Sequence, residues 1–138
     1  MIGKLFIPPK DLRTHWHYVR PRLEIVLKKS PESWIPEDIY ADILMGSSML
    51  WLMIENGNET LLPLGFIVGQ KQTDDTFFLW AGFCEPKIAD EIKWHLIEEA
   101  TRASGCNKIA FESWRRGWET KAKKLGFKPR KYIKELQI

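Results

Sequence analysis

A strand-to-helix turn is the first place where this sequence could do chemistry. The stretch Ala81–Leu96, AGFCEPKIADEIKWHL, is typical of a strand that runs directly into a helix. Helix N-termini present free backbone N–H groups, which bind phosphates. Phosphate turns usually carry glycines, but none follows Gly82 here, and Glu85 and Asp90 stand where an anion would lie. The turn is a candidate anion site whose acids would repel the anion, with Lys87 as the one favourable charge.

A second candidate lies where a predicted strand ends. Glu112 and Ser113 close that strand, and Glu112 is the best available general base if the protein is an enzyme. The alternative is a structural carboxylate paired with Arg115 or Arg116.

The histidines do not indicate a metal centre. His15 and His17 are two residues apart, so on a helix their side chains point ~200° from each other. No cluster of carboxylates accompanies them, and His95 lies beside the apolar face of a predicted helix, which favours a structural role. We therefore expect no metal.

Basic residues are concentrated near the C-terminus. The net charge is +3, but residues 115–134 carry +8 and the remainder carries −5. A basic segment can attract nucleic acid or a phosphate-rich ligand. We favour a solvated helix face over a nucleic-acid partner, because several apolar residues give the segment a side that can pack: Trp118, Ala122, Leu125 and Phe127.

The length of 138 residues predicts one domain, residues 1–138, and 44% apolar residues are enough for a core. No apolar run approaches the ~20 residues that cross a bilayer. The start MIGKLFIPPK lacks the features of a secretory signal. Cys84 and Cys106 are isolated, which indicates reduced thiols, so we expect a cytoplasmic protein with no membrane partner.

The N-terminal half predicts one strand, two helices and a meander of three strands. Residues 4–9 read as an edge strand, and apolar residues at helical spacing predict a helix over 12–26 that Pro21 kinks or splits. A second helix opens at Pro36 and stops at Gly46. Three strand-like runs follow, separated by turns that suit antiparallel hairpins: 49–55, 61–70 and 76–83.

The C-terminal half alternates helices and strands. A helix spans residues 89–104, with Asp90 as its N-cap and Gly105 as its stop. A strand over 108–113, a helix over 116–125 and a last strand over 131–138 follow. The order β-αα-βββ-α-β-α-β predicts an α/β (α+β) fold with a mixed, mostly antiparallel sheet and helices on its faces.

Trp94 has two possible environments. It lies ~160° around its helix from both Ile92 and Leu96. It either points outward, where it would form a partner or homodimer surface, or packs beneath the N-terminal helices.

Three stretches carry a resemblance to a known family. LWLMIENGNETLLPLGFIVG looks like two paired strands with a Gly-Phe pair, ATRASGCNKIAFE like a helix end, glycine and strand, and KAKKLGFKPRKY like a helix closed by Leu-Gly-Phe. Together with the element order, they resemble the GNAT superfamily of acyl-coenzyme A N-acyltransferases over nearly the whole chain.

The resemblance implies where an acyl-CoA would bind. It would lie between the fourth and fifth strands, with its pantetheine amides on backbone near Trp80 and Gly82. Its pyrophosphate would sit at the turn that holds Lys87, Ile88, Ala89 and Asp90. A substrate amine would attack the thioester, which requires a base, an oxyanion donor and an acid.

Several positions depart from the family pattern. Ile88 and Asp90 stand at two Gly or Ala positions of the phosphate turn, and Glu85 stands at its Arg or Gln position. Ala122 replaces the Tyr that serves many members as general acid, and no Asn lies near Arg115. These departures predict a degenerate CoA pyrophosphate loop.

Two functional hypotheses follow from the resemblance. The first is an N-acyltransferase-like protein that uses acetyl-CoA or another acyl-CoA weakly and acylates an unidentified amine. The second is a non-catalytic accessory protein with this fold, of the short phage- or prophage-encoded kind, that binds a protein partner.

Overall fold

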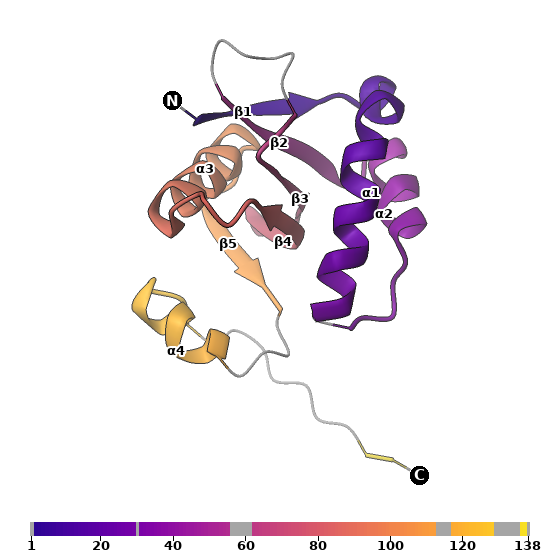
Figure 1. Ribbon diagram of the computed structural model, residues 1–138. Coiled ribbons are helices and arrows are strands. Elements are labelled where there is room, and N and C mark those ends of the chain that lie inside the picture. The colour runs from indigo at the N-terminus through magenta and orange to yellow at the C-terminus, as the bar shows by residue number, and fades with distance from the viewer. Residues whose placement is uncertain (1, 30, 56–61, 113–116, 129–135, 138) are drawn as a thin grey trace.

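The computed structural model describes residues 2–29, 31–55, 62–112, 117–128 and 136–137. A five-stranded sheet runs through the middle of the molecule, with helices on both sides (Figure 1). The elements along the chain are β1 (Ile2–Ile7), a 3-10 turn (Pro9–Asp11), α1 (Leu12–Lys29), α2 (Pro36–Leu44), β2 (Met49–Glu55), β3 (Gly65–Lys71), β4 (Thr76–Cys84), α3 (Asp90–Ala103), β5 (Lys108–Phe111) and α4 (Gly117–Lys124).

The sheet has the strand order β1-β2-β3-β4-β5. The first four strands pair antiparallel, and β5 pairs parallel to β4 after the crossover through α3. This confirms the predicted mixed, mostly antiparallel sheet. The last predicted strand, 131–138, falls outside the described residues except for 136–137.

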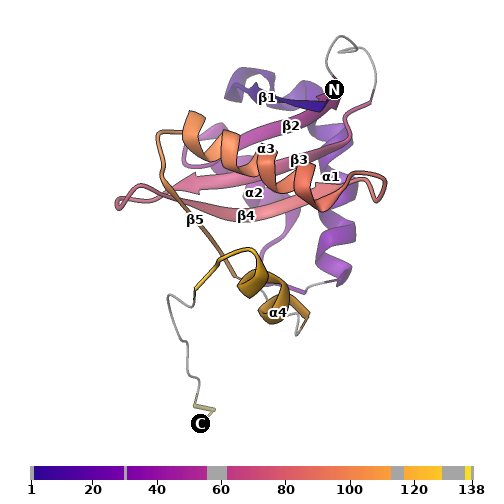
Figure 2. The same cartoon turned by 90° about the vertical axis from the view of Figure 1, so that its left-hand side faces the viewer.

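The two faces of the sheet bury separate cores. Helices α1 and α2 cover one face, and α3 and α4 lie on the other (Figure 2). The α1 face buries Leu12, Val19, Leu23, Ile39, Ile43, Leu50, Leu52, Phe66 and Val68, and the α3 face buries Trp51, Met53, Ile67, Phe77, Leu96, Ile97 and Ala100. Alternate side chains of a strand point to opposite faces, which explains why neighbours in β2 and β3 belong to different cores.

Helix α1 is one helix of 18 residues with Pro21 inside it, so of the two predicted effects of Pro21, a kink or a split, the split is excluded. Proline removes one backbone donor and clashes with the preceding turn. The buried side chains of Tyr18, Val19 and Leu23 flank Pro21 and hold both halves of the helix against the sheet. Among the helices described here, none is long and apolar enough to pass through a membrane.

Strand β4 contains a bulge at Trp80. Val68 of β3 lies opposite Ala81 and Gly69 opposite Leu79, so Trp80 has no counterpart in β3. The extra residue places Trp80 and Ala81 on the same face, against the α1 core. The ring of Phe77 fills the space beside Gly69, where a Cβ would lie 2.0 Å from the ring.

Candidate functional site

Strands β4 and β5 part before β4 ends, and we call this unpaired edge of β4 the opening. Their pairing runs from Thr76–Lys108 to Leu79–Phe111, whereas β4 continues to Cys84. Within the described ranges, β4 therefore has no strand partner on its β5 side after Leu79. This is the place where the sequence resemblance puts the pantetheine arm of an acyl-CoA.

Gly82 turns its backbone groups toward this opening. The N–H of Glu85 donates to the carbonyl oxygen of Leu64 at 2.9 Å, so Glu85 faces β3. Residues of an antiparallel strand face their partner alternately, which makes Phe83 face β3 as well and leaves the N–H and C=O of Gly82 on the other side. Gly82 is exposed, and its predicted role as a backbone partner for a pantetheine amide fits this geometry.

The turn between β4 and α3 leaves backbone donors at the helix start. The N–H of Ile88 donates to the carbonyl oxygen of Glu85 at 3.0 Å, and the N–H of Lys93 is bonded to the carbonyl of Ala89 at 3.1 Å. The N-cap is Ala89, which has no side-chain capping bond. The amides of the first turn of α3 therefore have no intrahelical acceptor, as at any helix N-terminus.

Asp90 is the first residue of α3, so its predicted role as N-cap is wrong. Its carboxylate instead pairs with two lysines, Lys121 of α4 at 2.9 Å and Lys93 at 3.3 Å. Hydrogen bonding from Lys121, together with Lys93, holds the pKa of Asp90 below its usual range. The aspartate charge that would repel an anion is thus compensated by two cations.

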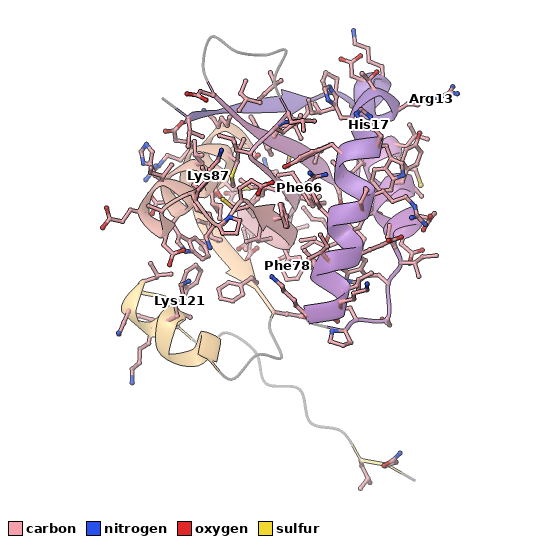
Figure 3. All side chains as sticks on the ribbon, viewed as in Figure 1. Arg13, His17, Phe66, Phe78, Lys87 and Lys121 are labelled. Atoms are coloured by element: carbon pink, nitrogen blue, oxygen red, sulfur yellow. The ribbon has the colours of Figure 1, made fainter. Side chains whose placement is uncertain are left out.

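These lysines were not among the predicted site residues. The spacing of Asp90 and Lys93, three positions apart on one helix, was a signal available in the sequence. Lys121 carried no such signal, because only the packing of α4 brings it to α3, as Figure 3 shows.

Lys87 lies in the turn between β4 and α3. It lines a pocket of about 280 Å³ whose wall also includes Glu55, Leu62, Pro63, Leu64 and Glu85. The same wall thus carries two carboxylates and one ammonium group, a mixed charge that does not favour an anion there. Lys87 and Ile88 remain predicted cofactor residues by position.

Glu112 follows β5 directly and is exposed. Since Phe111 pairs with Leu79, Glu112 sits at the mouth of the opening, where a general base would be needed. Its alternative partners Arg115 and Arg116 lie outside the described residues. Its role as base stays a prediction.

The cysteines offer no activated nucleophile. Cys84 is half-buried and Cys106 is buried, and neither forms a disulfide. Burial raises the pKa of both thiols. No group of three or more histidine, cysteine or acidic side chains that could hold a metal occurs in the parts of the chain that the structure describes.

Comparisons with known proteins bear on the fold. No protein-family model matches the sequence, and no curated protein matches it. Among solved structures, the aminoglycoside N-acetyltransferase AAC(6')-Iy, bound to a bisubstrate analogue of CoA, has a TM-score of 0.66 at 17% identity, covering 100% of this chain and 98% of that chain. A predicted acetyltransferase from Clostridium acetobutylicum, with acetyl-CoA, has a TM-score of 0.61 at 15% identity, covering 99% of this chain and 96% of that chain.

A ribosomal-protein-alanine N-acetyltransferase from Brucella melitensis has a TM-score of 0.62 at 9% identity, covering 100% of this chain and 99% of that chain. The likeness extends over nearly the full length of each protein. The chain has the fold of the GNAT acetyltransferases, in a divergent form.

Proposed function

We propose that this protein binds an acyl-CoA in the opening between β4 and β5 and transfers the acyl group to an amine. The observation that carries the proposal is the parting of the two strands after Leu79, which leaves the backbone of Gly82 facing outward beside the start of α3. The structural neighbours named above include one acetyltransferase bound to a bisubstrate analogue of CoA and one with acetyl-CoA.

The residues of the chain would divide the binding between them. Gly82 and the bulged Trp80 would pair through their backbone with the pantetheine amides. The amides that open α3, from Ala89 and Asp90 onward, would face the pyrophosphate, with Lys93 and Lys121 as the nearest cations. Each lysine already pairs with Asp90, so we expect weaker pyrophosphate binding than at a glycine-rich turn, in keeping with a degenerate loop.

The reaction would be attack of a neutral amine on the thioester carbonyl carbon. The new C–N bond forms as the C–S bond breaks, and the amine loses a proton that Glu112 accepts directly or through water. The departing thiolate would take its proton from solvent, because Ala122 stands where a tyrosine acid is found in related enzymes. A phage or prophage origin remains a hypothesis, since the comparisons do not address it.

Isothermal titration with acetyl-CoA tests the proposal. We expect a dissociation constant in the micromolar to low millimolar range, and weaker binding by a variant in which Gly82→Pro removes the outward N–H. A matched control is Gly82→Ala, which keeps the backbone N–H and whose Cβ would lie in ordinary contact, 3.4 Å from the carbonyl oxygen of Phe66. Absence of binding at millimolar acetyl-CoA would contradict the proposed acyltransferase activity. The hypothesis of a non-catalytic accessory protein would then remain.

A further inference from the structure

An aromatic corner lies at the place where β4 and β5 part. Trp34, in the connection between α1 and α2, contacts Trp80 of the β4 bulge, with ring centroids 6.0 Å apart and planes at 75°. Both rings are half-buried, so each keeps an accessible part. The two rings thus meet nearly at a right angle, and part of the pair stays accessible to a ligand.

The surroundings of the corner are apolar. Phe78 lies two residues before Trp80 and belongs to the face of β4 that α1 covers, as Figure 3 shows. Ile35, next to Trp34, is 55% exposed. A ligand that rests on the corner therefore meets apolar side chains around the two tryptophans.

A carboxylate lies at the same level of the sheet. Leu79 pairs with Phe111, and the next residues of the two chain segments are Trp80 and Glu112. Glu112 is exposed at the end of β5. Strand register therefore places Trp80 and Glu112 at corresponding positions of two neighbouring segments that are distant in the sequence.

This combination of groups recognises a cation with an apolar body. The faces of tryptophan rings attract ammonium groups, and a carboxylate adds a charge partner. We infer that Trp34, Trp80 and Glu112 bind the acceptor as a primary ammonium ion that carries an aromatic or alkyl body. A polyhydroxylated amine would leave its hydroxyl groups against apolar side chains and would bind less well.

This ammonium ion would be the acceptor substrate of the proposed acyl transfer. Only its acylation, and not its binding, rests on the proposed function. Binding of the amine does not need an acyl-CoA, so it can be measured alone. The bound ammonium ion then loses its proton to Glu112 or to water before it attacks, which places the carboxylate in both steps.

The probes are 2-phenylethylamine and 2-phenylethanol, which have nearly the same shape but differ in charge at pH 7. We expect calorimetry on the full chain, with and without CoA, to show binding of the amine and roughly tenfold weaker binding of the alcohol. Equal affinities for the two, or no binding of the amine in either condition, would overturn the inference.

Matched variants locate the site. Trp34→Leu keeps an apolar side chain but removes the aromatic face, and Glu112→Gln removes the charge, so each should weaken amine binding by roughly tenfold. The control is Trp16→Leu, since Trp16 packs edge-to-face on Tyr40 at 4.9 Å in a similar aromatic pair away from the opening. Circular dichroism checks that all three variants fold, and equal losses in Trp16→Leu and Trp34→Leu would refute the assignment.

The same titrations separate the inference from the proposed function. Binding of the amine without any binding of acetyl-CoA would support the site and contradict the transferase. Binding of acetyl-CoA without discrimination between the amine and the alcohol would support the transferase and refute this substrate class.

Discussion

At the scale of single residues, Tyr18 has an unusual environment. Its side chain is 2% exposed, and its hydroxyl has no hydrogen-bond partner among the described residues. Burial raises the pKa of Tyr18 to about 12, so the hydroxyl stays neutral. The guanidinium of Arg22 lies over the ring, 3.8 Å from its centroid. The ring is held by packing, whereas the hydroxyl contributes a desolvation cost.

Replacing Tyr18 with phenylalanine should therefore stabilise the protein. A buried hydroxyl without a partner costs about 1–3 kcal/mol, and we expect Tyr18→Phe to recover about 1 kcal/mol in the free energy of unfolding, measured with urea. Tyr40→Phe, at a half-buried tyrosine, serves as the control and should change stability little. A loss of stability in Tyr18→Phe would mean that the hydroxyl has a water or ligand as its partner.

Asp90 is the second residue whose environment gives a prediction. Replacing it with asparagine removes the negative charge that Lys93 and Lys121 now contact, so Asp90→Asn should bind acetyl-CoA a few-fold more tightly in the same titration. The control is Glu91→Gln, which removes a neighbouring negative charge in the first turn of α3 without releasing the two lysines. An equal gain in both variants would mean that net charge alone is responsible.

The ion pairs of Asp90 with the two lysines also make the free energy of unfolding depend on pH. The pKa of Asp90 is lowered in the folded state, so its contribution is present above the pKa of an unfolded aspartate and is lost as the pH falls through the lowered value. Thermal unfolding of the protein and of Asp90→Asn should therefore differ slightly at neutral pH and converge in acid. The difference should be small because Asp90 is 57% exposed.

At the scale of elements, α3 is the centre of its face of the sheet. Trp94 is 7% exposed, so the interpretation of it as an outward-facing partner surface is wrong. It does not pack beneath the N-terminal helices either, because they lie across the sheet. The centroid of its ring lies 6.3 Å from that of Phe111 in β5 and 5.5 Å from that of Phe127, just after α4. Trp94 thus joins α3, β5 and the end of α4.

Removal of this ring should loosen α4 before the rest of the fold. We expect Trp94→Ala to lower the free energy of unfolding by about 3 kcal/mol and to speed tryptic cleavage after Lys123 and Lys124. Trp94→Phe keeps an aromatic ring and should lose much less. Unchanged cleavage in Trp94→Ala would show that the Asp90–Lys121 ion pair is enough to hold α4.

At the scale of the whole molecule, the sheet separates two cores and also positions the site. The α1 face supplies Trp34 and the α3 face supplies the start of α3, while β4 lies between them. Lys4 of β1 pairs with Glu99 of α3 at 3.0 Å and ties the edge strand to this helix. An acyl donor and an amine could therefore approach the parting strands from opposite faces.

Much of this architecture was predictable from the sequence. Turns between three strand-like runs predicted the meander, and glycines predicted where the helices end, as the left-handed backbone of Gly105 and Gly126 confirms with φ of +80° and +90°. The cap of α3 and the environment of Trp94 were predicted incorrectly. The N-cap of α3 lies one residue earlier than predicted, and the environment of Trp94 depends on the end of α4, whose place in the fold has no local signal.

The sequence by itself determined the elements, their order and the candidate residues, because hydrophobic periodicity and turn residues act over a few positions. Only the tertiary structure decided that Lys121 compensates Asp90, that the bulge turns Trp80 toward Trp34, and that Glu112 lies level with that pair. These contacts join segments far apart in the chain, and their geometry comes from strand register and helix packing, which no local pattern of residue types specifies.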